Sequence, residues 1–335
     1  MNKLVTYLRA PLFVWWDITY QCNLHCKHCY SDSGSPAENE LTTSEVKGIL
    51  NQLAEMKVFY IYFLGGEPFL RRDFLEIAKY CQEINLSVMV NTNGWFIDYE
   101  MARKIKEAGI HHIRVSIDGA TPETHDRIRE VKGSFQKALQ ALEVLKQVEI
   151  PVIGISPTIM KENFSEASSI IDLAFQYKVS EIQLVQLCST GRGRRIESIS
   201  LNQLKQLQLA VAKKKDEYFG KLQVSATPGI LKECLSCTIG QGNKPAMIGC
   251  LAGRGAVNIS PEGLVMPCLL DRKLIGDFRR ESFRKIWEDA PEIIKRRTVN
   301  GVCLDCQYQD ICSRECPLEI TSETIKKIRE HYVKK

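Results

Sequence analysis

Apolar and polar residues along the first 220 positions alternate with two different periods, which predicts strands and helices in turn. Six short apolar runs bounded by polar or turn residues are typical of buried strands. They are 13–19, 58–64, 87–91, 112–117, 151–159 and 181–187. Between them, apolar residues recur every three or four positions, as in amphipathic helices. One of these helices is expected to begin at Thr42, which with Glu45 has the spacing of a capping box.

This alternation predicts an α/β fold with a parallel sheet, because each parallel connection needs a crossover that is usually a helix. Six such units suit either an open barrel or a doubly wound sheet. In both arrangements the reactive site lies beyond the carboxyl ends of the strands. The segment that follows the first strand is therefore expected at the site.

The pattern changes after about residue 220, where helical periodicity fades and glycine, proline and cysteine become frequent. We therefore predict two domains, residues 1–220 and 221–335. The thirteen cysteines follow the same division: three lie at 22, 26 and 29, eight lie between 234 and 316, and only two lie between these groups. An odd number of cysteines in a chain without an export signal argues against a disulfide framework.

Composition and charge exclude several classes of protein. Hydrophobic residues make up 44% and charged residues 25% of the 335 residues, as in an ordinary soluble globular protein. The net charge of +5 comes from scattered basic residues, so it does not favour a nucleic-acid partner. No apolar run reaches the roughly 18 residues of a membrane span, and the N-terminus has no signal-peptide pattern. We expect a cytoplasmic protein with no membrane partner.

The sequence "CNLHCKHCY" places Cys22, Cys26 and Cys29 in a polar loop after the first strand. Core cysteines would not gather in such a loop, and a disulfide would leave one thiol over. Zinc would want a fourth ligand, and His25 and His28 lie too close in sequence to close a tetrahedron without strain. An iron–sulfur cluster takes thiolates on separate irons, so three cysteines leave one iron open for a substrate or cofactor.

The C-x3-C-x2-C spacing of these cysteines resembles the signature of the radical S-adenosylmethionine (radical SAM) superfamily. The resemblance implies a partial (β/α)6 barrel and a [4Fe–4S] cluster whose open iron is chelated by the amino and carboxylate groups of S-adenosylmethionine. It also implies that the reduced cluster passes one electron to the sulfonium. The 5′-deoxyadenosyl radical that results then abstracts a hydrogen atom from the substrate.

Further motifs lie where this family has its cofactor contacts. The segment "LGGEP" resembles the family's glycine-rich turn, in which Gly65, Gly66 and Glu67 hold the methionine amino group. Two such glycines can also form a plain tight turn. The segments "NTNG" and "VSIDG" end the third and fourth strands. The resemblance implies that the cofactor and substrate side is lined by Asn91, Ser116 and Asp118, with His28 beside the adenine.

The later cysteines resemble the SPASM extension, which carries auxiliary [4Fe–4S] clusters. The resemblance implies one auxiliary cluster on Cys250, Cys268 and Cys316, with Cys234 or Cys237 as its fourth ligand. A second auxiliary cluster would be held by Cys303, Cys306 and Cys312. The family pattern ends on one more cysteine, which this chain lacks. The second cluster would then have an open iron, a ligand such as Asp305 or Asp310, or a ligand from elsewhere. The alternative for the last four cysteines is a zinc ribbon.

Two cysteines are candidates for catalysis. Cys188 ends the sixth strand and could face the site. Cys237, if it is not a ligand, could donate a hydrogen atom, as a thiol does in epimerising relatives, or be an inert neighbour. Cys81 lies on an apolar helix face and is expected in the core. The arginines of "GRGRR" (191–195) could hold a substrate carboxylate or lie in a solvated loop.

These features predict an enzyme that modifies a peptide or protein, with crosslinking, thioether formation and epimerisation all open. A flavodoxin or ferredoxin is expected as the reductant. A separate protein is expected for leader-peptide recognition, because no such domain precedes Cys22. One alternative is oxidative decarboxylation of tetrapyrrole propionates, as in the alternative heme pathway. The other is a non-catalytic iron–sulfur or zinc protein.

Overall fold

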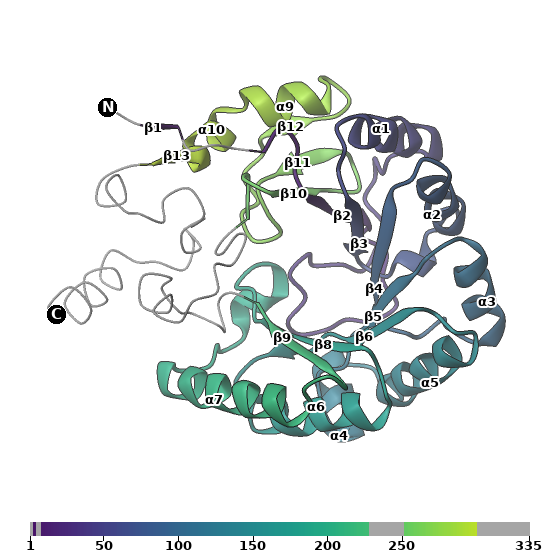
Figure 1. Ribbon diagram of the computed structural model, residues 1–335, viewed down its shortest axis with the longest axis vertical. Coiled ribbons are helices and arrows are strands. Elements are labelled where there is room, and N and C mark those ends of the chain that lie inside the picture. The colour runs from purple at the N-terminus through teal and green to yellow at the C-terminus, as the bar shows by residue number, and fades with distance from the viewer. Residues whose placement is uncertain (1–2, 5–7, 228–250, 300–335) are drawn as a thin grey trace, which may run out of the picture.

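Strands and helices alternate in the computed structural model, which describes residues 3–4, 8–227 and 251–299 (Figure 1). The six predicted strands are all present, and a helix follows each strand of the predicted series. The elements up to residue 227 are β2 (Phe13–Thr19), α1 (Thr43–Glu55), β3 (Tyr60–Gly65), α2 (Phe74–Glu83), β4 (Ser87–Thr92), α3 (Tyr99–Glu107), β5 (His112–Val115), α4 (Pro122–Arg129), α5 (Ser134–Gln147), β6 (Val152–Ile155), β7 (Thr158–Ile159), α6 (Ala167–Gln176), β8 (Glu181–Gln186), α7 (Leu201–Glu217) and β9 (Gln223–Ala226).

The strands form one parallel run, in which β2, β3, β4, β5, β6, β8 and β9 are neighbours in that order. Figure 1 shows them as an arc with the helices on its outer side. This arrangement confirms the predicted α/β class. The parallel run is longer than the six predicted strands, because β9 extends it at one end and β10 (Ala256–Ile259) at the other.

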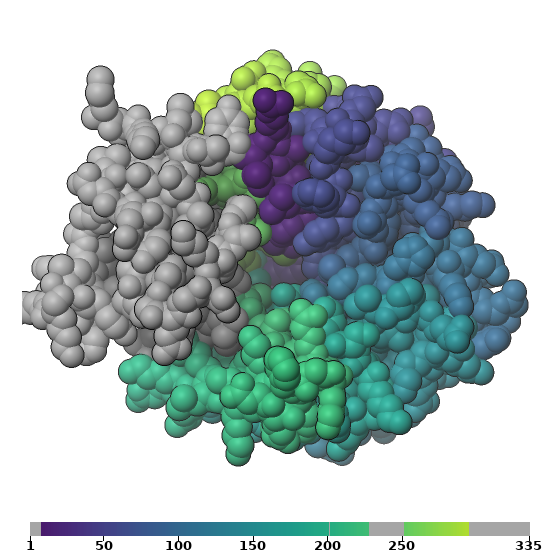
Figure 2. All heavy atoms as spheres, viewed as in Figure 1, coloured from purple at the N-terminus to yellow at the C-terminus, as the bar shows by residue number. Residues whose placement is uncertain are grey.

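The cysteine-rich C-terminal part joins the same sheet. Its elements are β10 (Ala256–Ile259), β11 (Leu264–Met266), β12 (Gly276–Asp277), α9 (Phe283–Asp289), α10 (Pro291–Arg297) and β13 (Thr298–Val299). Strand β10 pairs with β2 in parallel, and β11 and β12 follow in antiparallel pairs. Trp287 in α9 donates a hydrogen bond to the carbonyl of Leu8. In Figure 2 the described N-terminal segment (purple) lies next to the C-terminal segment that contains α9 (yellow-green). The division near residue 220 stays a prediction.

Alternate residues of each strand face the helices and form the core. Val14, Trp16, Ile61 and Phe63 are buried without exposure in one cluster with the apolar faces of the helices. Cys81 belongs to this cluster, as predicted, and Thr42 forms the predicted capping box with Glu45. The opposite side of the strands carries polar residues such as Asn91 and Gln183, together with aromatic residues such as Trp15 and Tyr62. Within the described residues, no helix is both long and apolar enough to cross a bilayer.

Two details differ from the sequence prediction. The run 151–159 is two strands, β6 and β7, because Pro157 has no amide hydrogen and interrupts the ladder. Thr158 donates its amide hydrogen to the Asp118 carboxylate instead. Helix α4 was not predicted, although Thr121 at its N-cap and Pro122 at its first position are typical start signals.

Candidate functional site

The three N-terminal cysteines lie in the loop between β2 and α1, which we call the cysteine loop (residues 20–36). This loop begins at the carboxyl end of β2, and Figure 1 shows it inside the arc of strands. The amide of Cys22 donates to the carbonyl of Gly34 at 2.9 Å, and the amide of Gly34 donates to Tyr20 at 2.9 Å. The ends of the loop are thereby held together, at the edge of the sheet where the sequence predicted the site.

The three thiols are neighbours in a largely desolvated place. Cys26 is buried, whereas Cys22 and Cys29 are half-buried. Burial, helped by repulsion from the Glu67 carboxylate and the Cys26 and Cys29 sulfurs, raises the pKa of Cys22 to about 12. Three thiolates this close therefore need a multiply charged cationic centre between them. This donor set fits an iron–sulfur cluster bound through three cysteines.

No three His, Cys, Asp or Glu side chains converge on one point as single-metal ligands, in the ranges 8–227 and 251–299. Thiolates on a single zinc would lie about 3.8 Å apart. A cubane does not require such convergence, because each thiolate binds a separate iron.

Two of the sulfurs accept contacts from elsewhere in the chain. The amide of Ser33 donates to the Cys29 sulfur at 3.4 Å. The Arg129 guanidinium donates from Nη1 to the Cys26 sulfur at 3.7 Å. Hydrogen bonds to cluster sulfurs influence the reduction potential. Arg129 belongs to α4, so the sequence analysis missed it together with that helix.

Arg129 also forms a buried ion pair with Asp118, whose Oδ2 lies 2.6 Å from the Arg129 Nε. Burial alone would raise the pKa of Asp118, but Arg129, His28 and His125 lower it below its usual value. The His28 ring nitrogen Nε2 lies 3.5 Å from the same carboxylate. Burial lowers the pKa of His28 to about 4, so this ring is neutral near pH 7. Its Nδ1 has no hydrogen-bond partner among the described residues.

The glycines of the predicted turn lie directly against the cysteine loop. Gly65 has a φ of +114°, and a Cβ there would lie 2.3 Å from the carbonyl oxygen of Thr19. A Cβ at Gly66 would lie 2.1 Å from the carbonyl oxygen of Gln21. The glycines therefore let the turn after β3 approach the backbone that leads into Cys22. Their contact with S-adenosylmethionine stays a prediction.

Glu67 is buried without exposure and its carboxylate has three internal donors. Oε2 accepts from the Asn93 amide at 2.8 Å, and Oε1 accepts from the Thr92 hydroxyl at 2.8 Å and the Phe69 amide at 3.2 Å. Burial raises the pKa of Glu67 to about 7, against the lowering effect of these donors. The carboxylate thus ties the turn after β3 to the end of β4. Its predicted contact with the methionine amino group is untested.

The inner side of the sheet carries a hydrogen-bonded group that we call the inner polar wall: Tyr62, Asn91, His112, Arg114, Glu181 and Gln183. The Tyr62 hydroxyl donates to Asn91 at 2.9 Å, and Arg114 donates to Tyr62 at 3.3 Å. Arg114 also donates to Glu181 and Gln183, and Glu181 contacts His112 at 2.6 Å. Ser116 follows Arg114 on the same side and is half-buried. Asn91 and Ser116 therefore lie on the inner side of the sheet, and their contact with the cofactor or substrate stays a prediction.

Arg272 connects the C-terminal part to the cysteine loop. Its guanidinium donates to the Tyr20 hydroxyl at 3.0 Å and lies 5.9 Å from the ring centroid of Tyr30. The Tyr30 hydroxyl donates to buried Asp17 at 2.6 Å. Four residues before Arg272, the Cys268 sulfur accepts from the Asp271 amide at 3.2 Å. A predicted ligand of the auxiliary cluster is thus joined to the loop that holds the first three cysteines.

The remaining predicted residues divide into two groups. Cys188 follows β8 and is half-buried, with its sulfur 3.7 Å from the carbonyl of Gln186. Its catalytic role stays a prediction. The others lie outside the described residues: Cys234, Cys237, Cys250, Cys303, Asp305, Cys306, Asp310, Cys312 and Cys316.

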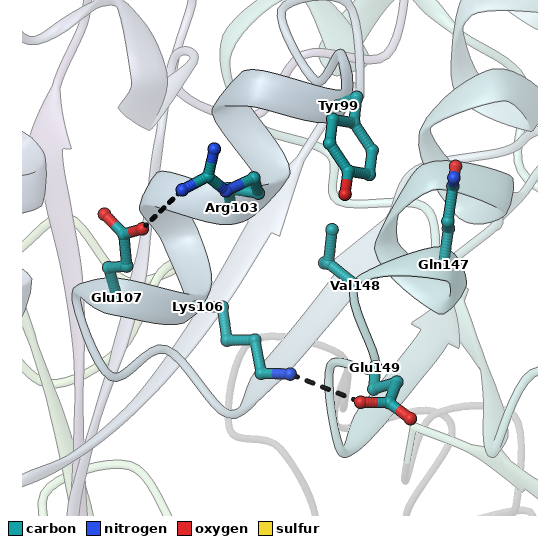
Figure 3. Close-up of a pocket in the computed structure, with 7 residues that line it drawn as sticks. All are labelled: Tyr99, Arg103, Lys106, Glu107, Gln147, Val148 and Glu149. Atoms are coloured by element: carbon teal, nitrogen blue, oxygen red, sulfur yellow. Dashed lines mark hydrogen bonds and ion pairs between the residues drawn. The ribbon is translucent and has the colours of Figure 1, made fainter.

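A surface pocket beside α3 lies away from this site (Figure 3). Its charged side chains pair with one another, Arg103 with Glu107 at 3.4 Å and Lys106 with Glu149 at 3.5 Å. Its lining residues come from α3, the end of α5 and the turn after α5, and none belongs to the cysteine loop.

Comparison with known proteins gives matches over almost the whole chain. The family model of the radical SAM superfamily matches residues 16–174, and that of an iron–sulfur cluster-binding domain, SPASM, matches residues 250–317. The AdoMet-dependent heme synthase of Methanosarcina barkeri is 32% identical over 324 residues, which cover 92% of each chain. The mycofactocin maturase MftC of Mycobacterium ulcerans is 31% identical, over 92% of this chain and 84% of its own.

Solved structures share the fold at lower identity. Streptococcus suis SuiB bound to S-adenosylmethionine has a TM-score of 0.74 and 18% identity, over 92% of this chain and 73% of SuiB. The anSMEcpe structure with bound AdoMet and a Cp18Cys peptide has a TM-score of 0.69 and 17% identity, over 96% of both chains.

Proposed function

Because the chain belongs to the radical SAM superfamily and carries a SPASM iron–sulfur domain, we propose that it removes a hydrogen atom from an unactivated carbon of a peptide or protein. The cofactors of this enzyme are S-adenosylmethionine, a [4Fe–4S] cluster and auxiliary clusters. When bound, the first cluster supplies the electron that cleaves S-adenosylmethionine reductively. A one-electron donor such as a flavodoxin or ferredoxin is part of the proposal.

In this proposal the residues of the cysteine loop and the residues next to it have separate roles. Cys22, Cys26 and Cys29 hold the first cluster. The neutral His28 ring lies beside the adenine, and its unpaired Nδ1 is available as an acceptor or donor. Asn91 and Ser116 contact the cofactor or substrate from the inner side. Glu67 supports the site by fixing the backbone at Asn93, and Asp118 supports it by holding Arg129 in place.

The inner polar wall is the main observation that favours a peptide substrate. Amides and hydroxyls of a peptide can exchange hydrogen bonds with the half-buried side chains of Asn91 and Gln183. A tetrapyrrole instead buries two broad apolar faces, and apolar surroundings contribute most of the free energy of such binding. The mycofactocin maturases, at 30% to 31% identity, support the same choice.

The test is an anaerobic reaction of the reconstituted enzyme with S-adenosylmethionine, dithionite and peptides encoded beside its gene. We expect one peptide to change: crosslinking or thioether formation removes two hydrogen atoms, and epimerisation in deuterated water introduces deuterium. Mass spectrometry distinguishes these outcomes. Formation of 5′-deoxyadenosine with no change in any such peptide, or in a protein pull-down partner, would contradict the proposal.

A second candidate rests on one observation, the 32% identity to AdoMet-dependent heme synthase over 92% of both chains. It predicts oxidative decarboxylation of the propionates of an iron–coproporphyrin. The same reaction mixture with Fe-coproporphyrin III in place of peptide tests it. Loss of carbon dioxide from the porphyrin would favour this candidate over the peptide.

A further inference from the structure

The segment "GRGRR" lies on the cysteine loop. It forms a short 3-10 helix, η3 (Gly191–Arg195), after β8. The backbone amide of Arg192 donates to the carbonyl of Cys29 at 3.0 Å. Its side chain donates from Nε to the carbonyl of Cys26 at 2.9 Å and from Nη1 to the carbonyl of Ser33 at 3.0 Å. One residue therefore holds three backbone positions of the loop, including those of two predicted cluster ligands.

Both neighbours of Arg192 have to be glycine. Gly191 has a φ of +54°, and a Cβ there would lie 2.4 Å from the carbonyl oxygen of Cys29. A Cβ at Gly193 would lie 2.3 Å from the carbonyl oxygen of Cys188 and 3.2 Å from that of His28. Contacts this short leave no room for a side chain. The end of β8 and the cysteine loop are therefore in direct backbone contact.

The other arginines of the segment behave differently. Arg194 and Arg195 are exposed, and neither side chain forms a hydrogen bond or ion pair with a described residue. The Arg192 side chain is only 15% exposed, and its one carboxylate partner in the described part of the chain is the exposed Asp32 at 3.2 Å. The Arg192 guanidinium thus donates mainly to backbone carbonyls of the loop, where its planar set of donors fixes their positions.

We propose that Gly191, Arg192 and Gly193 form a brace for the cysteine loop, and that Arg192 is a positioning residue of the first cluster. Anchoring the carbonyls of Cys26 and Cys29 fixes the backbone from which both thiols project. Without the anchors, the loop has to order itself around the iron, so the cluster is held less tightly. The proposal rests on the assignment of the first cluster to Cys22, Cys26 and Cys29.

The test compares Arg192→Gln with Arg194→Gln in the full chain, reconstituted anaerobically. The readouts are iron content, the electron paramagnetic resonance signal of the reduced enzyme, and the rate at which a ferrous chelator removes iron. A variant with Cys22, Cys26 and Cys29 all replaced by Ala identifies the first cluster, because it should lack about four irons. We expect Arg192→Gln to lose those irons about ten times faster than the wild type. Arg194→Gln should match the wild type, and the auxiliary iron should be unaffected.

Arg192→Lys provides a second variant that keeps the charge and one donor group, so it should lie between the wild type and Arg192→Gln. Equal chelation rates and spectra for Arg192→Lys, Arg192→Gln and Arg194→Gln would overturn the brace. A triple cysteine variant that keeps all its iron would instead overturn the ligand assignment on which the brace depends. The two failures are therefore distinguishable.

Discussion

At the scale of single residues, the Arg129 guanidinium lies between the Cys26 sulfur and the Asp118 carboxylate, and both partners are buried. A buried ion pair is costly to break, because removing one partner leaves the other charge without compensation. Without Arg129, Asp118 would still contact the His28 ring and the Thr158 amide. Neither of these partners carries a full positive charge near pH 7.

The expected result for Arg129→Gln is a loss of about 3–5 kcal/mol in the free energy of unfolding. Adding Asp118→Asn removes the unpaired charge, so the double variant should be more stable than Arg129→Gln alone. Urea unfolding of the four apo-proteins gives this double-mutant cycle. Additive losses in the double variant would show that the pair is not coupled.

Glu67 gives a prediction for pH. Its folded-state pKa, about 7, lies above the ordinary value near 4.5, so the folded protein binds a proton more tightly than the unfolded chain. This contribution to stability is present below the unfolded pKa and is lost as the pH rises from about 4.5 through 7. The wild type should therefore lose stability relative to Glu67→Gln between pH 5 and pH 7. A difference in unfolding free energy that stays constant over this range would mean that Glu67 is already ionised at pH 5.

At the scale of elements, the turn after β3 is placed by its fit against the cysteine loop. A Cβ at Gly66 would lie 2.1 Å from the carbonyl of Gln21, whereas one at Gly48 in α1 would meet nothing within 4 Å. Gly66→Ala should therefore separate the turn from the loop and destabilise the first cluster. Gly48→Ala is the matched control and should stabilise the protein by about 0.5–1 kcal/mol, as expected inside a helix. Thermal unfolding and iron content measure both effects, and equal iron content in the two variants would contradict this account.

The elements also show which features could be predicted from sequence. The strands and most helices follow from local apolar periodicity, and the cysteine loop follows from its position after β2. The contacts of Arg129 with Cys26 and of Arg192 with Cys26 join residues 103 and 166 positions apart. Such pairings depend on how the units are arranged in space, and nothing in the local pattern of the arginines signals them. The internal donors to Glu67 at Thr92, Asn93 and Phe69 depend on the folded turn, so the sequence does not signal them. The contact of Glu67 with the methionine amino group stays a prediction.

At the scale of the whole molecule, the C-terminal part is joined to the barrel at the site. Strand β10 lies beside β2, and Asn258 in β10 donates to Asp17, which also binds Tyr30 of the cysteine loop. Arg272, which lies in the same segment as Cys268, donates to the Tyr30 carbonyl and lies over the Tyr30 ring. The two parts of the chain therefore both contribute residues around the cysteine loop, and the domain division near residue 220 stays a prediction.

The central claim is that Cys22, Cys26 and Cys29 hold the cluster that cleaves S-adenosylmethionine. The most direct measurement is the formation of 5′-deoxyadenosine under dithionite, by the reconstituted wild type and by the variant with these three cysteines replaced by Ala. We predict that the wild type forms 5′-deoxyadenosine and that the variant forms none, while it keeps its auxiliary iron. Equal formation by the two proteins, or none by a wild type with its full iron content, would contradict the claim.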